Sequence, residues 1–175
     1  MQDWIITENK DDGRKGCLTG ALLTLNCALG RRGVIAERNK TEGDGATPLG
    51  RYPVRRVFYR PDKITPPVCH LPIDPITPAM GWCDAADHSC YNQLIEKPFG
   101  PSHELLWRDD DLYDLILVIG HNDDPPVAGK GSAIFLHVTR DEYEPTEGCA
   151  SFKIKDFKKL ISMIKRGDHV VFARC

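Results

Sequence analysis

Turn-forming residues are spread along the whole chain, and their spacing limits the length of any regular element. The 175 residues include 15 Gly and 13 Pro, and the apolar runs between them are mostly short. Short apolar runs bounded by Gly and Pro are typical of strands joined by turns and disfavour long helices. The sequence therefore predicts a mainly β fold, and its length predicts a single domain over residues 1–175.

Several segments have the apolar and β-branched composition of strands. They are residues 4–7, 21–25, 33–36, 52–59, 115–120, 133–138 and 169–173. One helix is predicted near the C-terminus, because apolar residues recur every three or four positions from Ile154 to Ile164. Gly167 is expected to end this helix, and its apolar side is expected to pack on the sheet.

A proline-rich segment occupies residues 60–101. It includes Pro66, Pro67, Pro72, Pro75 and Pro78. Because proline lacks an N–H donor and fixes its own φ angle, regular central strands are not expected there. The segment predicts a long ordered excursion, of the kind that frames binding sites, with Trp82 as an anchor.

The charge composition disfavours a nucleic acid as partner. The chain has 23 Lys and Arg against 25 Asp and Glu, and no stretch concentrates the basic residues with aromatics. Residues 1–15 have no basic start followed by an apolar core, so no secretory signal is predicted. Residues 18–29 are too short and too polar to predict a membrane span. The oligomeric state stays open.

The seven cysteines do not form a disulfide framework, because they are irregularly spaced and odd in number. Mostly reduced thiols are expected, although Cys83 and Cys90 could pair in an oxidising compartment. A zinc site is the alternative use of some of these residues. Its candidate ligands are Cys69, His70, Cys83, His88 and Cys90. Their spacing fits no familiar zinc motif, so neither a metal nor a cofactor is predicted.

Cys149 is the candidate nucleophile. It lies between Gly148 and Ala150, so little bulk flanks the thiol and a substrate carbonyl could approach it. A thiol attacks as the thiolate and therefore needs a base. His137 is the candidate base, because the apolar run 131–138 predicts a buried strand that would hold its imidazole rigidly. Cys149 is accordingly expected to be the most reactive of the seven thiols.

Strand geometry makes a further prediction about His137. Side chains alternate along a strand, so His137 should share a face with Ala133 and Phe135, and the residues between them should face the other way. Taken alone, however, a Cys is more often a small buried hydrophobic residue, and a His on an apolar strand more often has a structural role. The residue types by themselves leave both interpretations open.

The sequence around this pair resembles the YkuD-type L,D-transpeptidases. The family signature is a His, a gap, and then Ser or Thr, His, Gly and Cys, and here His137 is followed by Thr146-Glu147-Gly148-Cys149. Other matching segments resemble the branch often labelled ErfK/YbiS/YcfS/YnhG. They are GDGATPLG (43–50), GWCD (81–84), NDDP (122–125) and GSAIF (131–135). The resemblance extends over roughly residues 20 to 173.

The resemblance implies a β-sandwich or barrel with one main C-terminal helix and the long Pro-rich excursion. It also implies an enzyme that cross-links peptidoglycan stem peptides. The cysteine of such an enzyme attacks the peptide bond after the L-centre of diaminopimelate in a tetrapeptide stem and releases the terminal D-alanine. The acyl group then passes to an amine of another stem.

Carried over residue by residue, Cys149 is the nucleophile, His137 is its base, and the N–H groups of Gly148 and Cys149 help to hold the oxyanion. The candidate substrate-binding residues are Glu147, His121 and Asn122.

Two residues depart from the family pattern. Glu147 replaces the usual His, and Ser151 stands where many members have Arg or Asn. A carboxylate that faced the thiol would oppose thiolate formation, so Glu147 is expected to point away from the sulfur toward the substrate groove.

Two alternatives to a transpeptidase remain open at this stage. One is an L,D-carboxypeptidase, in which water accepts the acyl group, and the other is a non-catalytic wall-binding module. The implied substrate places the protein in the cell envelope or periplasm, whereas the predicted lack of a signal peptide makes the cytoplasm the alternative location.

Overall fold

The computed structural model describes residues 1–175, apart from the side chain at position 141. The N-terminal strands are β1 (Asp3–Glu8), β2 (Lys15–Gly20), β3 (Leu23–Ala28), β4 (Val34–Ala36) and β5 (Thr47–Tyr59). The middle strands are β6 (Ile73–Pro75), β7 (Met80–Cys83), β8 (Leu94–Glu96) and β9 (His103–Leu105). The C-terminal elements are β10 (Leu115–Ile119), β11 (Phe135–Val138), β12 (Ala150–Phe152), the helix α1 (Ile154–Met163) and β13 (His169–Ala173). Short 3₁₀ turns lie at Glu37–Asn39 and Asp141–Tyr143.

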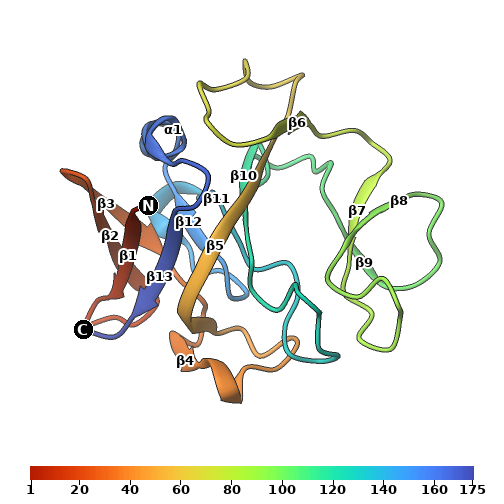
Figure 1. Ribbon diagram of the computed structural model, residues 1–175, viewed down its shortest axis with the longest axis horizontal. Helices are drawn as coiled ribbons and strands as arrows, with labels where there is room; N and C mark the ends of the chain where they lie inside the picture. Colours follow the sequence, from red (N-terminus) through yellow and green to blue (C-terminus); the bar gives the residue numbers. More distant parts are fainter.

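The main sheet closes on itself, and the protein is mainly β, as the sequence predicts. The strands follow the order β10-β11-β12-β3-β2-β1-β13-β5, and β5 also pairs with β10, which completes a barrel (Figure 1). Most neighbours are antiparallel, whereas β1 with β13 and β11 with β12 are parallel. Closure leaves no free edge on these strands, because the long strand β5 pairs with β13 on one side and with β10 on the other.

The barrel interior and one side of the helix α1 form a single apolar core. Its members come from β1, β2, β3, β5, β10, β11, β12 and β13, and α1 adds Phe157, Leu160 and Ile161. The rings of Phe152 and Phe157 stack at 5.6 Å, which joins the helix to β12. The prediction that the helix packs its apolar side on the sheet is confirmed. The helix ends at Met163, before Gly167, because the backbone of Ile164 is already extended.

Two predicted strands are corrected by the structure. The segment 21–25 is not one strand: Ala21 and Leu22 have positive φ angles of 43° and 69° and form the turn of the β2–β3 hairpin. The predicted strand 133–138 begins only at Phe135, because Ala133 has a φ angle of 52°. Positive φ at non-glycine residues has no marker in the hydrophobic pattern, which is why the sequence missed both breaks.

The proline-rich excursion contains short strands that the sequence did not predict. Strand β7 lies between β8 and β9 in a separate three-stranded sheet, so a central strand does form within residues 60–101. The expectation was wrong because β7 and β8 fall in the intervals between prolines and keep their N–H donors. Trp82 of β7 packs edge-on against Phe135 of β11 with ring centroids 4.9 Å apart, and this contact anchors the excursion on the barrel.

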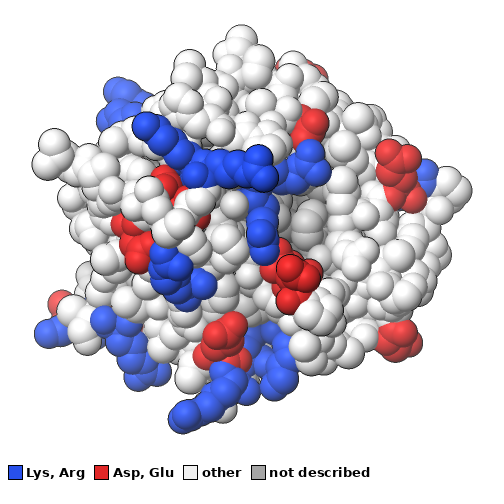
Figure 2. All heavy atoms as spheres, viewed as in Figure 1, with Lys and Arg blue, Asp and Glu red and all other residues white. Residues whose placement is uncertain are grey.

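Charges of both signs are interspersed on the surface. Figure 2 shows one face, on which Lys and Arg side chains lie close to Asp and Glu. Several of these side chains form ion pairs, including Arg51 with Asp3 and Arg55 with Asp123, both at 2.8 Å. Among the described residues, no helix has both the length and the apolar character required to cross a membrane.

Candidate active site

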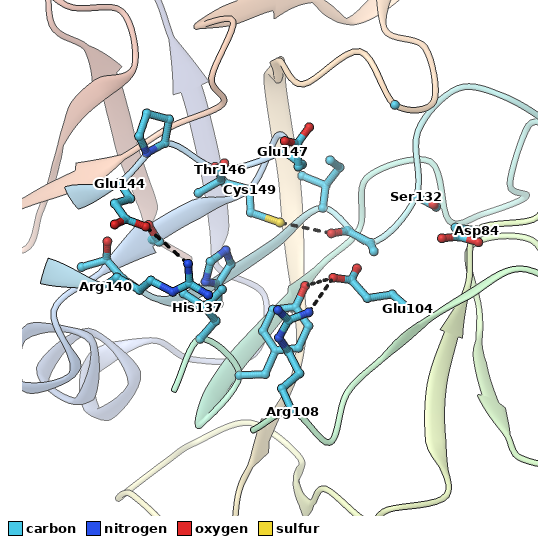
Figure 3. Close-up of a pocket in the computed structure, with 18 of the residues that line it drawn as sticks. Asp84, Glu104, Arg108, Ser132, His137, Arg140, Glu144, Thr146, Glu147 and Cys149 are labelled. Atoms are coloured by element: carbon cyan, nitrogen blue, oxygen red, sulfur yellow. Dashed lines mark hydrogen bonds and ion pairs between the residues drawn. The ribbon is translucent and has the colours of Figure 1, made fainter. Parts of the chain in front are cut away.

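A cavity of about 500 Å³ lies against the outer side of β11 and β12, and both Cys149 and His137 line it (Figure 3). Cys149 immediately precedes β12, and His137 is paired with Ser151 across the parallel β11–β12 ladder. Strand alternation turns Cys149 and Ser151 to the same side, toward the row that contains His137. The fold therefore brings the two predicted residues into one cavity.

The alternation predicted for β11 is confirmed. Ile134, Leu136 and Val138 belong to the barrel core. Ala133 and Phe135 belong to a second apolar cluster on the outer side, together with Cys149. The excursion covers this outer cluster with Ile76 and Trp82, and Leu106, just after β9, adds to the cover. The site is therefore enclosed between a barrel strand and the proline-rich segment.

The thiol of Cys149 is held by two backbone groups of the neighbouring chain. It donates to the carbonyl oxygen of Ala133 at 3.2 Å and accepts the N–H of Phe135 at 3.3 Å. Only 8% of the residue is exposed, and this burial raises the pKa of the thiol to about 12. The N–H of Phe135 lowers this pKa, and the negative charge of Glu104 raises it further. In the free protein Cys149 is therefore a thiol that donates its proton to a carbonyl.

The imidazole of His137 has a defined tautomer. Its Nδ1 lies 2.8 Å from the carbonyl oxygen of Val138, and because a carbonyl can only accept, Nδ1 must carry the proton. Nε2 then holds the lone pair that can take a proton from the cavity. Burial lowers the pKa of His137 to about 4, and an edge-on contact with Tyr113 at 5.4 Å supports the ring.

Both members of the pair are therefore neutral at ordinary pH. A thiol with a pKa of about 12 beside an imidazole with a pKa of about 4 does not transfer its proton in the resting state. The arrangement suits a base that removes the proton as the sulfur attacks. It does not favour a stored thiolate–imidazolium pair. That Cys149 is the most reactive of the seven thiols stays a prediction, and Cys175 is the exposed thiol.

The turn before Cys149 decides which N–H groups are available to a substrate. The hydroxyl of Thr146 accepts the N–H of Gly148 at 3.1 Å and donates to the carbonyl of Cys149 at 2.7 Å. The N–H of Cys149 has no hydrogen-bond partner within the part of the chain that the structure describes. In this conformation Cys149 is the better placed of the two predicted oxyanion donors.

The two departures from the family pattern occupy different environments. Both carboxylate oxygens of Glu147 accept the Nε–H of Arg31 at 2.9 Å, and the Glu147 side chain is 74% exposed at the cavity rim. The charge of Glu147 is not among the causes that shift the pKa of Cys149. Ser151, in contrast, is buried in the cavity beside His137, and its hydroxyl has no partner among the described residues.

His121 and Asn122 lie outside the cavity that holds Cys149. His121 is buried edge-on against Tyr52 at 5.3 Å, and burial lowers its pKa to about 4. Asn122 organises a loop: its side chain accepts the N–H of Val127 and donates to the carbonyls of Val127 and Gly131 at 2.8 to 3.0 Å. The structure therefore brings neither residue to the predicted nucleophile.

Sequence reasoning missed the carboxylate that does face the thiol. Glu104, from β9, lines the cavity and accepts the hydroxyl of Tyr113 at 2.6 Å. Arg108 lies 3.9 Å from the same oxygen of Glu104 (Figure 3). Burial raises the pKa of Glu104. Glu104, Arg108 and Tyr113 lie in one turn-rich stretch that matches no recognisable motif. Only their contacts in the folded protein show that they belong to the cavity.

Asn92 is a second residue that sequence reasoning missed. Its Oδ1 accepts the indole N–H of Trp82 at 2.9 Å and the N–H of Ala133 at 3.0 Å. Its Nδ2 donates to the carbonyls of His121 and Asn122 at 3.0 and 2.7 Å. Because Ala133 in turn accepts the thiol of Cys149, Asn92 ties the excursion to the segment that holds the nucleophile.

The zinc alternative receives no support from the geometry. No group of three His, Cys, Asp or Glu capable of holding a metal occurs among the residues that the structure describes. His70 pairs with Lys165 near the helix, whereas Cys83 lies in the separate sheet of the excursion. Cys83 and Cys90 are both free thiols.

Comparison with known proteins identifies a family. The family model described as YkuD, L,D-transpeptidase catalytic domain, matches residues 7–172. No curated protein and no solved structure matches the chain.

Proposed function

Because the chain belongs to the YkuD family of L,D-transpeptidase catalytic domains, we propose that it is a cysteine acyltransferase acting on peptidoglycan stem peptides. Cys149 is the nucleophile and His137 is its base. The donor is a tetrapeptide stem, and the acceptor is an amine of another stem. We also propose that it belongs to the ErfK/YbiS/YcfS/YnhG branch, which its segments 43–50 and 131–135 resemble.

The single observation that carries this proposal is the hydrogen bond from His137 Nδ1–H to the carbonyl of Val138, at the back of the cavity that Cys149 lines. It commits Nδ1 as donor and leaves Nε2 as the basic nitrogen, in a cavity whose described lining residues include one cysteine, Cys149. A histidine with a purely structural role would have no need of a free lone pair inside a cavity.

Acylation follows from these contacts. A stem peptide entering the cavity displaces the thiol from the carbonyl of Ala133, and the thiol proton passes to His137 Nε2 as the sulfur attacks the peptide carbonyl. The N–H of Cys149 donates a hydrogen bond to the oxyanion. The N–H of Gly148 becomes a second donor if it breaks its hydrogen bond to the hydroxyl of Thr146. His137 then donates the proton to the departing amine of D-alanine, which leaves a thioester on Cys149.

The choice of acceptor separates the two enzymatic alternatives. An amine acceptor resolves the thioester into a new amide bond, whereas water resolves it into a free carboxylate and makes the protein an L,D-carboxypeptidase. We favour the amine, because Glu42, Asp84 and Glu104 are among the residues that line the same cavity, and their carboxylates suit an incoming ammonium group. We also propose that the protein acts in the cell envelope, where the family's substrate lies, and fractionation of the native host tests this location.

Incubation of the protein with a tetrapeptide stem, followed by intact mass spectrometry, tests the proposal. The expected result is an adduct of the tripeptide acyl mass on Cys149, with release of one D-alanine. Cys149→Ala is the matched control and should give no adduct. If wild-type protein binds the stem without an adduct, it is a wall-binding module. If the adduct resolves only to free tripeptide in the presence of an acceptor stem, it is a carboxypeptidase.

A further inference from the structure

One end of the catalytic cavity carries more negative charge than the protein neutralises. Glu42, Asp84 and Glu104 all line the cavity, and Figure 3 shows Asp84 and Glu104 on the side of the excursion. Glu42 accepts the hydroxyl of Tyr91, and Glu104 accepts that of Tyr113. Within the described part of the chain, neither Glu42 nor Asp84 forms an ion pair with Lys or Arg.

The cations at this end of the cavity are committed to other carboxylates. Lys40 is buried and ion-paired with Asp44. Arg108 bonds Asp110 at 2.7 Å and lies farther, at 3.9 Å, from Glu104. Burial raises the pKa of Glu104, and the charges of Asp84 and Glu42 add to the increase. The three carboxylates therefore repel one another in a partly desolvated space, where the lining cations Lys40 and Arg108 pair more closely with Asp44 and Asp110.

A second observation points to a missing ligand at the same end. Ser132 lines the cavity beside this group and is only 7% exposed, yet its hydroxyl has no partner among the described residues. One oxygen of Asp84 is likewise buried without a partner. A buried polar group without a hydrogen-bond partner destabilises the protein, so these atoms are suited to a ligand that brings hydrogen-bond donors. A primary ammonium group brings three donors and one positive charge.

We propose that Glu42, Asp84, Glu104 and Ser132 form an ammonium-binding subsite that receives the amino group of the acyl acceptor. This inference rests on the proposed function, since it assigns the acceptor position of the same site. The subsite selects a primary amine over water by charge, and it delivers the amine to the side of the cavity that faces the Cys149 thioester.

Transfer from this subsite balances in atoms and charge. The bound ammonium gives one proton to a carboxylate of the subsite and becomes a neutral amine. Its nitrogen attacks the thioester carbon, the C–N bond forms, and the electrons of the broken C–S bond return to sulfur. His137 Nε2 takes the second proton from nitrogen and passes it to the sulfur. The products are an amide, the free thiol and one proton that the carboxylate releases to water.

The first test measures how the acyl-enzyme partitions between amine and water. The probe amine is 1,5-diaminopentane, and 1,5-pentanediol is its neutral counterpart. Glu104→Gln and Asp84→Asn should each raise the half-saturating concentration of the diamine by roughly tenfold or more, the scale of one lost hydrogen bond to a charged group. The rate of acyl-enzyme formation is measured separately in each variant, so that the partition between amine and water is compared independently of any change in acylation. Glu144→Gln is the matched control, because Glu144 lines the cavity but pairs with Arg140.

The second test does not depend on acylation. Backbone amide NMR of the unacylated protein, titrated with 1,5-diaminopentane, should show saturable shifts at Asp84, Glu104 and Ser132. These shifts should be lost in the Asp84→Asn variant, whose side chain makes no hydrogen bond that folding requires among the described residues. Unshifted amides, or an unchanged partition ratio in both variants, overturn the subsite. Absence of any acyl-enzyme in wild-type protein overturns the proposed function instead, and the NMR result still decides whether the subsite binds ammonium.

Discussion

The two faces of β11 are buried to a similar degree, but one faces the barrel core and the other faces the cavity. On the inner face, Leu136 and Val138 pack in the apolar barrel core. On the outer face, His137 lines the cavity, and Phe135 donates its N–H to the thiol of Cys149. Adjacent residues of one strand thus belong either to the interior that stabilises the fold or to the chemistry of the site. Because the inner face is tightly packed, the side chains of the outer face are held in fixed positions.

Burial has opposite consequences on the two faces. For an aliphatic side chain it contributes stability, at about 1.5–3 kcal/mol for each large residue. For titratable groups it penalises the charged form, which is why the pKa of Cys149 is raised and that of His137 is lowered. Substitutions on the two faces should therefore separate loss of stability from loss of catalysis, and the predictions that follow run from the largest expected effect to the smallest.

Replacement of Cys149 by Ala should have the largest effect on activity and a small effect on folding. Removal of the nucleophile should lower D-alanine release by ~10³-fold or more, because no other group can form the acyl intermediate. Loss of the two thiol hydrogen bonds should change the free energy of unfolding by only about 1 kcal/mol. Urea unfolding and a D-alanine assay measure the two quantities. Retained D-alanine release would remove Cys149 from the mechanism.

Replacement of Leu136, the neighbour of His137, by Ala should have a large effect on stability and a small effect on activity. Leu136 is fully buried in the barrel core, so truncation should lower the free energy of unfolding by about 2–5 kcal/mol. The fraction that remains folded should keep a normal rate of acylation. Urea unfolding followed by single-turnover acylation at low denaturant measures both. If acylation falls as far as it does in the Cys149 variant, the two faces are not separable.

Replacement of His137 by Ala should lower the rate of acylation by ~10²-fold or more, the contribution of a positioned general base. His121→Ala is the matched control, because His121 is also buried and has a similarly lowered pKa but lies outside the cavity. The control should affect acylation less. Single-turnover mass spectrometry gives both rates, and an equal loss in the two folded variants would transfer the role of base away from His137.

Acidic pH should weaken the fold through the two buried histidines. Burial lowers the pKa of both His137 and His121 from 6.5 to about 4. The unfolded chain then binds more protons between these values, so their contribution is present above 6.5 and is lost as the pH falls through 4. At about pH 4.5 each group should cost on the order of 2 kcal/mol. Urea unfolding at several pH values, with His137→Ala and His121→Ala as references, tests the slope, and a flat pH profile would contradict it.

Replacement of Glu147 by Gln should have the smallest effect on the nucleophile. The Glu147 carboxylate pairs with Arg31 at the exposed rim, so the rate at which iodoacetamide alkylates Cys149 should stay within about twofold. Glu104→Gln should accelerate the same alkylation more, since Glu104 raises the pKa of Cys149. Peptide mapping distinguishes Cys149 from the exposed Cys175. Faster alkylation in the Glu147 variant than in the Glu104 variant would reverse this assignment.

The sequence alone determined the class of fold and the two central residues of the site. Short apolar runs between Gly and Pro predict strands, and the apolar repeat of Ile154 to Ile164 predicts the helix, because both signals are local periodicities. The alternation around His137 is equally local, and it correctly assigned the faces of β11. The roles of Cys149 and His137 remain predictions that rest on the family resemblance and on their shared cavity.

Only the tertiary structure decided what surrounds that pair. Asn92 comes from the excursion and Glu104 from β9 just after it, and both reach the site through the closure of the barrel and the packing of Trp82 on Phe135. Such contacts join residues far apart in the chain, and they leave no periodic or spacing signal that a single sequence displays. The shifted pKa values have the same origin, since desolvation depends on which segments cover a group. The sequence therefore predicted the candidate nucleophile, and the fold determined the electrostatic environment that surrounds it.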